Sequence, residues 1–181
     1  MTTTSVQSAP RLGRYAIDPA ASSVGFTTRH LFGLGRVRGT FAIRGGSFVV
    51  TGPSAASAVR AEIDAGSFAT GHAGRDATVR SARLLDTDRH PLIVFTAERA
   101  AATELAGTLT VRGQARPVRL TVTGTTTAPD GTAFHLRATT RIDRTVFDVT
   151  AMRGLAGRHL DLELDVTCVW TGALDEDRPA R

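Results

Sequence analysis

The chain has 181 residues, of which 41% are hydrophobic. This length fits one domain with its own core, and the composition excludes a disordered chain. All 22 basic residues are arginine and the net charge is +5, but no run of five basic residues occurs. The sequence therefore lacks the clustered basic patch that nucleic-acid binding requires.

The single cysteine and the terminal sequences indicate the cellular compartment and the domain boundaries. Cys168 excludes an internal disulfide, and it is expected to be a small buried hydrophobe because it lies on an apolar face. The chain starts without the apolar core of a secretory signal, and no run of 18 apolar residues occurs. We therefore expect a cytoplasmic protein with one domain over residues 14–171, flanked by flexible tails at 1–13 and 172–181.

The first half of the domain consists of short alternating segments. Apolar and polar residues alternate over 22–30, 37–44 and 59–64, which is typical of strands with one buried face. Gly45-Gly46 predicts a hairpin turn before a strand that contains Phe48 and Val50. Residues 74–86 place Val79, Ala82 and Leu85 at spacings of three, and this spacing predicts a short helix.

Strands also dominate the second half. Residues 92–97 are a short apolar run, and 105–111 and 118–123 alternate. Pro129-Asp130-Gly131 predicts a turn into another alternating segment that starts at Phe134. Leu160 to Trp170 alternates most strictly, which places its apolar residues on one face of a strand.

Together these segments predict eight or nine strands joined mostly by short turns. One apolar face per strand indicates an antiparallel sheet with one side facing the core. A β-sandwich and a closed barrel both satisfy this periodicity.

The order of several motifs resembles the YceI-like family, also called polyisoprenoid-binding proteins, from Tyr15 to Trp170. The stretches that carry this resemblance are Tyr15-Ala16-Ile17-Asp18-Pro19 with Val37-Arg38-Gly39-Thr40-Phe41, Ser67-Phe68 with Arg75-Asp76 and Arg80-Ser81, His90-Pro91 with Gly107-Thr108-Leu109-Thr110-Val111-Arg112-Gly113, and Ile142-Asp143-Arg144 with Phe147. Two features of the sequence depart from the family pattern. Leu84-Leu85 stand where an aromatic residue is usual, and Asp148 stands where Gly is frequent.

The resemblance implies an all-β fold, namely an eight-stranded antiparallel lipocalin-like barrel with one or two short helices. It also implies a long apolar ligand inside the barrel, such as an isoprenoid quinone, a polyisoprenoid or a fatty amide. No cofactor and no nucleic-acid partner are implied. A transient contact with a membrane surface and a homodimer stay open.

A slender apolar tail suits such a barrel because each buried methylene contributes about 0.8 kcal/mol. Ten buried carbons then offer about 8 kcal/mol before the costs of binding. Ordinary core packing is the alternative role for each apolar candidate. His30 either meets a quinone oxygen or head group or is a hydrogen-bonded histidine of the core or rim. The predicted ligand-binding residues are Phe26, His30, Phe41, Ile43, Phe95, Leu109, Leu120, Phe134, Leu136 and Phe147, with Leu164 on the same inward face.

Polar candidates gather in two motifs of the resemblance. Asp76, near the start of the predicted helix, suits the positive end of the helix dipole. We also expect Asp143-Arg144 to form a structural latch with Arg75-Asp76. Arg29 and Arg80 are further polar candidates.

Signals for catalysis are weak. No two of the five histidines have the spacing of a helical metal pair, and no Gly-x-Ser-x-Gly motif occurs. Asp161 and Glu163 alternate to the outside of their strand. We therefore predict no catalytic residue, no metal site and no enzyme. An enzyme acting on a small apolar substrate in the barrel, or a filled barrel that acts as an interaction module, remains an alternative.

Overall fold

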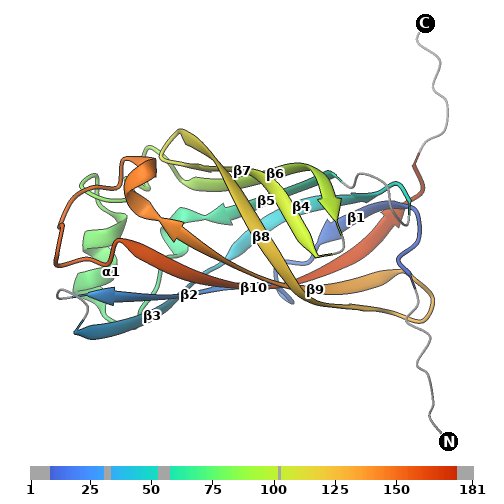
Figure 1. The fold of residues 1–181 in the computed structure, drawn as a ribbon, viewed down its shortest axis with the longest axis horizontal. Coiled ribbons are helices and arrows are strands. Elements are labelled where there is room, and N and C mark those ends of the chain that lie inside the picture. Colours follow the sequence, from blue (N-terminus) through green and yellow to red (C-terminus); the bar gives the residue numbers. More distant parts are fainter. Residues whose placement is uncertain (1–8, 31–33, 53–57, 102, 175–181) are drawn as a thin grey trace, which may run out of the picture.

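The computed structural model describes residues 9–30, 34–52, 58–101 and 103–174. These residues form an antiparallel β-structure with short helices (Figure 1). The strands are β1 (Gly13–Ile17), β2 (Ser23–His30), β3 (Gly35–Phe41), β4 (Ile43–Val50), β5 (Ala58–Asp64), β6 (Leu92–Ala101), β7 (Glu104–Val111), β8 (Gln114–Thr127), β9 (Ala133–Asp143) and β10 (His159–Gly172). The helices are η1 (Ala65–Ser67), α1 (Ala73–Arg80) and η2 (Arg144–Phe147).

Strand β10 closes the sheet into a barrel. Its second half pairs with β1, which also pairs with β4, and its first half pairs with β2, which continues to β3. Strands β1 and β2 thus follow each other along one edge of β10, and only Ala42 separates β3 from β4. If β1 with β2 counts as one long interrupted strand and β3 with β4 as another, these two strands and β5 to β10 form an eight-stranded antiparallel barrel. The predicted fold class is confirmed.

One end of the barrel is where β1 begins and β10 ends (Figure 1). Aromatic side chains pack together in the interior at this end. Phe134 packs edge-on against Tyr15 at 4.9 Å and against Phe48 at 5.1 Å between ring centroids. The Tyr15 hydroxyl donates to the backbone oxygens of Arg11 and Gly131, which fixes this cluster to the β8–β9 turn. Aromatic rings from β1, β4 and β9 therefore plug the interior at this end.

The predicted hairpin at Gly45-Gly46 is wrong. Both glycines lie inside β4, where the register with β5 shifts between Ile43 and Gly45. A Cβ at Gly46 would overlap the carbonyl oxygen of Arg60 and lie 2.8 Å from Ile17 Cδ1. The glycine pair thus marks a β-bulge with close backbone approach, which is the other common reason for glycine in a strand.

The predicted helix over 74–86 is confirmed but ends earlier. Helix α1 stops at Arg80, because Ser81 turns to extended backbone and its hydroxyl donates to the Thr78 carbonyl. The following turns bury Leu84 and Leu85. No helix among the described residues is long and apolar enough to cross a bilayer.

Candidate functional site: an apolar cavity inside the barrel

The interior holds a cavity of about 630 Å³. Inward-facing side chains of β2 to β10 form its wall, because alternation sends every second residue of each strand inside. This volume lies in the range of small-molecule sites. The described side chains therefore do not fill the barrel, contrary to the interaction-module alternative.

Most of the predicted ligand-binding residues line this cavity. All but Phe147, which ends η2, lie on strands, where alternation turns them inward. The same side chains belong to, or pack against, the buried hydrophobic cluster of the barrel. The residues brought together in this way are Phe26, Phe41, Ile43, Phe95, Leu109, Leu120, Leu136 and Phe147, with Leu164 beside them.

Two predicted residues are placed differently. Phe134 is buried in the aromatic cluster with Tyr15 and is not among the cavity-lining residues. His30 ends β2 opposite Gly35, and its side chain lies outside the described part of the structure. A contact between His30 and a head group stays a prediction.

Sequence periodicity missed the wall residues that come from irregular segments. Phe68 follows η1, and its ring stacks on Phe26 at 5.1 Å between centroids. Val149, Met152 and Leu155 come from the connection between η2 and β10. Phe68 belongs to a motif of the family resemblance, so that motif was the available signal. The connection between η2 and β10 has no apolar periodicity, so the sequence gave no signal for its wall residues.

Polar groups reach the cavity at the end opposite the aromatic cluster. His72 caps α1, because its Nδ1 accepts from the Arg75 backbone N–H at 3.2 Å. Arg75 Nε donates to the Thr70 hydroxyl at 2.8 Å, and that hydroxyl donates to Asp76 at 2.5 Å. His72, Arg75 and Thr78 all line this end of the cavity.

Asp76 fixes the start of α1. It is 7% exposed and accepts from both the backbone N–H and the hydroxyl of Thr70. The hydrogen bond from the Thr70 hydroxyl is the main cause that lowers the pKa of the Asp76 carboxyl. The role predicted for Asp76, at the helix start, matches this position.

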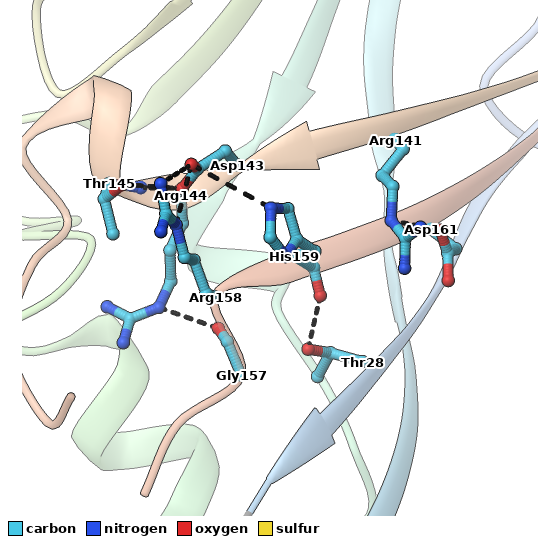
Figure 2. Close-up of polar contacts among 9 residues, drawn as sticks. All are labelled: Thr28, Arg141, Asp143, Arg144, Thr145, Gly157, Arg158, His159 and Asp161. Atoms are coloured by element: carbon cyan, nitrogen blue, oxygen red, sulfur yellow. Dashed lines mark hydrogen bonds and ion pairs between the residues drawn. The ribbon is translucent and has the colours of Figure 1, made fainter. Parts of the chain in front are cut away.

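Arg144 ties the connection over residues 148–158 to the barrel. Its guanidinium donates to the carbonyl of Gly157 at 2.8 Å (Figure 2). It also donates to the carbonyls of Ala156 at 3.2 Å and of Val149. Burial lowers the pKa of Arg144, and the neighbouring Asp143 opposes this shift. Arg144 therefore holds one rim of the cavity while it lines the wall.

The predicted latch between Asp143-Arg144 and Arg75-Asp76 is wrong. Among the described residues no ion pair joins these stretches, because each group has nearer partners. Asp143 pairs with Arg158 at 2.8 Å and accepts from the Thr145 hydroxyl at 2.6 Å (Figure 2).

The wall of the cavity provides a mostly apolar surface for contact with a ligand. None of the described residues that line it is acidic. Cys168 lies in the wall, where burial raises the pKa of its thiol to about 12. A protonated thiol is a poor nucleophile. No group of three described His, Cys, Asp or Glu residues is placed to hold a metal ion.

Comparison with known proteins decides the family. The model of the YceI-like domain matches residues 15–168. The chain belongs to the YceI-like family. A UPF0312 protein of Vibrio cholerae is 28% identical over 173 residues, which are 90% of each chain.

Solved structures with the YceI-like fold agree with the barrel. BcnA of Burkholderia cenocepacia superposes with a TM-score of 0.68 at 20% identity, over 83% of this chain and 98% of BcnA. A polyisoprenoid binding domain from Saccharophagus degradans gives 0.64 at 14% identity, over 89% and 100%. The Campylobacter jejuni YCEI protein gives 0.55 at 19% identity, over 64% and 73%.

The two departures from the YceI-like motifs have structural consequences. Leu84 and Leu85 both line the cavity, so aliphatic side chains shape the wall where the family usually has an aromatic residue. Asp148 ends η2 in the left-handed region, with φ of +60°. Glycine adopts this conformation most easily and aspartate tolerates it better than most residues, which explains both the family preference and the substitution.

Proposed function

We propose that the barrel binds one long apolar molecule, such as an isoprenoid quinone, a polyisoprenoid or a fatty amide, and carries or stores it. The observation that carries this proposal is the cavity of about 630 Å³, whose wall is apolar along most of its length. Its likeness to a polyisoprenoid binding domain supports the same ligand class. A homodimer and the cytoplasmic location stay predictions.

The two ends of the cavity suit the two ends of such a ligand. The aromatic cluster around Phe134 offers only apolar contact, which suits the tip of a tail. The guanidinium groups of Arg75 and Arg144 supply hydrogen-bond donors at the other end, where a quinone or amide oxygen accepts. Orientation by a few polar groups and affinity from apolar burial are the usual division in such sites.

A variant that fills the cavity tests the proposal. Ala138 is 2% exposed and lines the cavity from β9, so Ala138→Trp projects an indole into the ligand volume. Ala115→Trp is the matched control, because Ala115 is exposed on β8. Native mass spectrometry and organic extraction of the freshly purified proteins are the measurements.

We expect the wild type and Ala115→Trp to carry a species with a polyprenyl or long acyl tail, and Ala138→Trp to lack it. Circular dichroism confirms that both variants are folded. A wild type that is empty and also binds no added quinone or fatty amide would overturn the proposal.

A further inference from the structure

Two leucines are exposed at the end of the barrel that carries α1. Leu34, which precedes β3, is 90% exposed, and Leu155, in the connection over 148–158, is 50% exposed. The end of β2, the start of β3, α1 and this connection lie together at one end of the molecule, opposite the end where β1 begins and β10 ends (Figure 1). We call this region the α1 end. Single exposed leucines are common on protein surfaces, so a second feature is needed before they indicate an interaction site.

The second feature is a pair of unmatched arginines on the outer surface beside these leucines. Arg29 of β2 lies directly opposite Arg36 of β3, and both are exposed. Like charges in directly opposed positions destabilise a sheet. Among the described residues, no acidic side chain forms an ion pair with either arginine.

These arginines belong to a surface groove of about 390 Å³. Its other cations already have partners: Arg141 pairs with Asp161 at 3.2 Å, and Arg158 pairs with Asp143 at 2.8 Å (Figure 2). The groove thus keeps two uncompensated positive charges, on Arg29 and Arg36.

The groove adjoins the polar end of the cavity. Thr28, Ala156 and Gly157 line both the groove and the cavity. Gly157 packs so closely on β2 that a Cβ there would overlap the Thr28 hydroxyl and the Arg29 carbonyl oxygen. The connection that carries Leu155 is therefore fixed against the strand that carries Arg29.

We propose that the α1 end is a docking surface for an anionic phospholipid bilayer. Guanidinium groups suit phosphate geometry, so Arg29 and Arg36 meet lipid phosphates while Leu34 and Leu155 enter the interface between head groups and acyl chains. Charge complementarity favours this partner, and the exposed leucines favour a bilayer over a purely polar polyanion. Docking needs only this surface, but its use in loading the cavity rests on the proposed function.

The test is flotation of the full chain with vesicles of phosphatidylcholine alone or mixed with phosphatidylglycerol. Leu34→Glu/Leu155→Glu removes the apolar contacts, and Leu12→Glu/Val169→Glu is its control. Leu12 and Val169 are 54% and 44% exposed, and they belong to the terminal end of the barrel. Arg29→Gln/Arg36→Gln removes the charges, and Arg14→Gln/Arg119→Gln is its charge-matched control.

We expect the wild type to bind phosphatidylglycerol vesicles and to be released by added salt. Each arginine lost from the surface should weaken binding about fivefold. The leucine variant should lose most binding, and both control variants should keep it. Equal binding to pure phosphatidylcholine, no vesicle binding, or equal losses in the controls would each overturn the proposal.

Two further measurements separate docking from ligand binding. Ala138→Trp should still dock, and Arg29→Gln/Arg36→Gln should still carry the extracted ligand. A protein that docks but carries no ligand sinks the proposed function alone, and one that carries ligand but does not dock sinks the docking surface alone. Heparin that binds the leucine variant and the wild type equally, with no vesicle binding, would assign the arginines to a polyanion instead.

Discussion

Asp143 is a single polar residue that holds together the segments at the rim of the cavity. Its carboxylate accepts from the backbone N–H and the hydroxyl of Thr145, which starts η2. It also pairs with Arg158 just before β10. The hydrogen bond from Arg158 is the main cause that holds the pKa of Asp143 well below its usual range. One carboxylate therefore joins both ends of the connection over residues 148–158.

Asp143→Ala should lower the free energy of unfolding by about 1–2 kcal/mol at neutral pH, because the start of η2 loses its acceptor. The Asp143 pKa is lower in the folded state, so this contribution is complete above about pH 4 and is lost as the pH falls further. Urea unfolding from pH 7 to pH 3 measures the difference. Asp161→Ala is the control, since Asp161 forms an exposed pair with Arg141 worth under about 1 kcal/mol. Equal effects of the two substitutions would contradict this role.

Cys168 provides a residue-scale test of the interior. Burial raises the pKa of its thiol to about 12, and the side chain is 1% exposed. We expect a thiol reagent at pH 8 to leave the folded protein unlabelled and to label it fully in denaturant, as mass spectrometry would show. Rapid labelling of the folded protein would contradict the burial of this position.

Alternation predicted which side chains face inward but not how deep each lies along the barrel axis. Phe41 and Phe134 have the same kind of pattern, yet Phe41 lines the cavity and Phe134 packs in the aromatic cluster. Depth depends on the register between strands that are distant in the sequence. Phe134, for example, lies opposite Cys168. A single sequence carries no signal for that register.

At the scale of elements, strands with strict alternation and the turn at Pro129-Asp130-Gly131 were predicted well, and the role of Gly45-Gly46 was not. The segment from Leu160 to Trp170 lies within β10 as expected. Gly45-Gly46 satisfies a hairpin and a bulge equally well in sequence, and the structure decides through the crowding between β4 and β5. Helix α1 ended early because a serine hydroxyl competes for the helix carbonyls, which spacing alone does not reveal.

Gly46→Ala and Gly45→Ala separate crowding from backbone conformation. The two glycines have φ of +156° and +158°, so both alanines bear a similar backbone cost. Only Gly46 faces the Arg60 carbonyl, whereas nothing lies within 4 Å of a Cβ at Gly45. We expect Gly46→Ala to be less stable than Gly45→Ala by about 1–3 kcal/mol in chemical denaturation. Equal stability of the two variants would mean that the β5 backbone moves away from the added methyl group with no loss of folding free energy.

At the scale of the whole molecule, apolar periodicity could not distinguish a closed barrel from a β-sandwich. Every strand has one apolar face in a sandwich as in a barrel, and the resemblance to a family was needed to choose. Closure depends on β10, which pairs with β1 and β2 on one side and with β9 on the other. An unfilled interior also depends on side-chain packing across the barrel, so the cavity became visible only in three dimensions.

A cavity of this size couples ligand binding to global stability. A ligand that binds only the folded state adds about 2.7 kcal/mol at a hundredfold excess over its Kd. For a domain of this length, each kcal/mol shifts the melting temperature by about 2–4 °C. Protein stripped of lipid should therefore melt about 5–10 °C higher when hexadecanamide is added, as scanning calorimetry would show. Acetamide, which has the same head group without the tail, should have no effect, because the apolar wall binds the tail. A shift of equal size in Ala138→Trp would mean that the ligand stabilises the protein from outside the cavity.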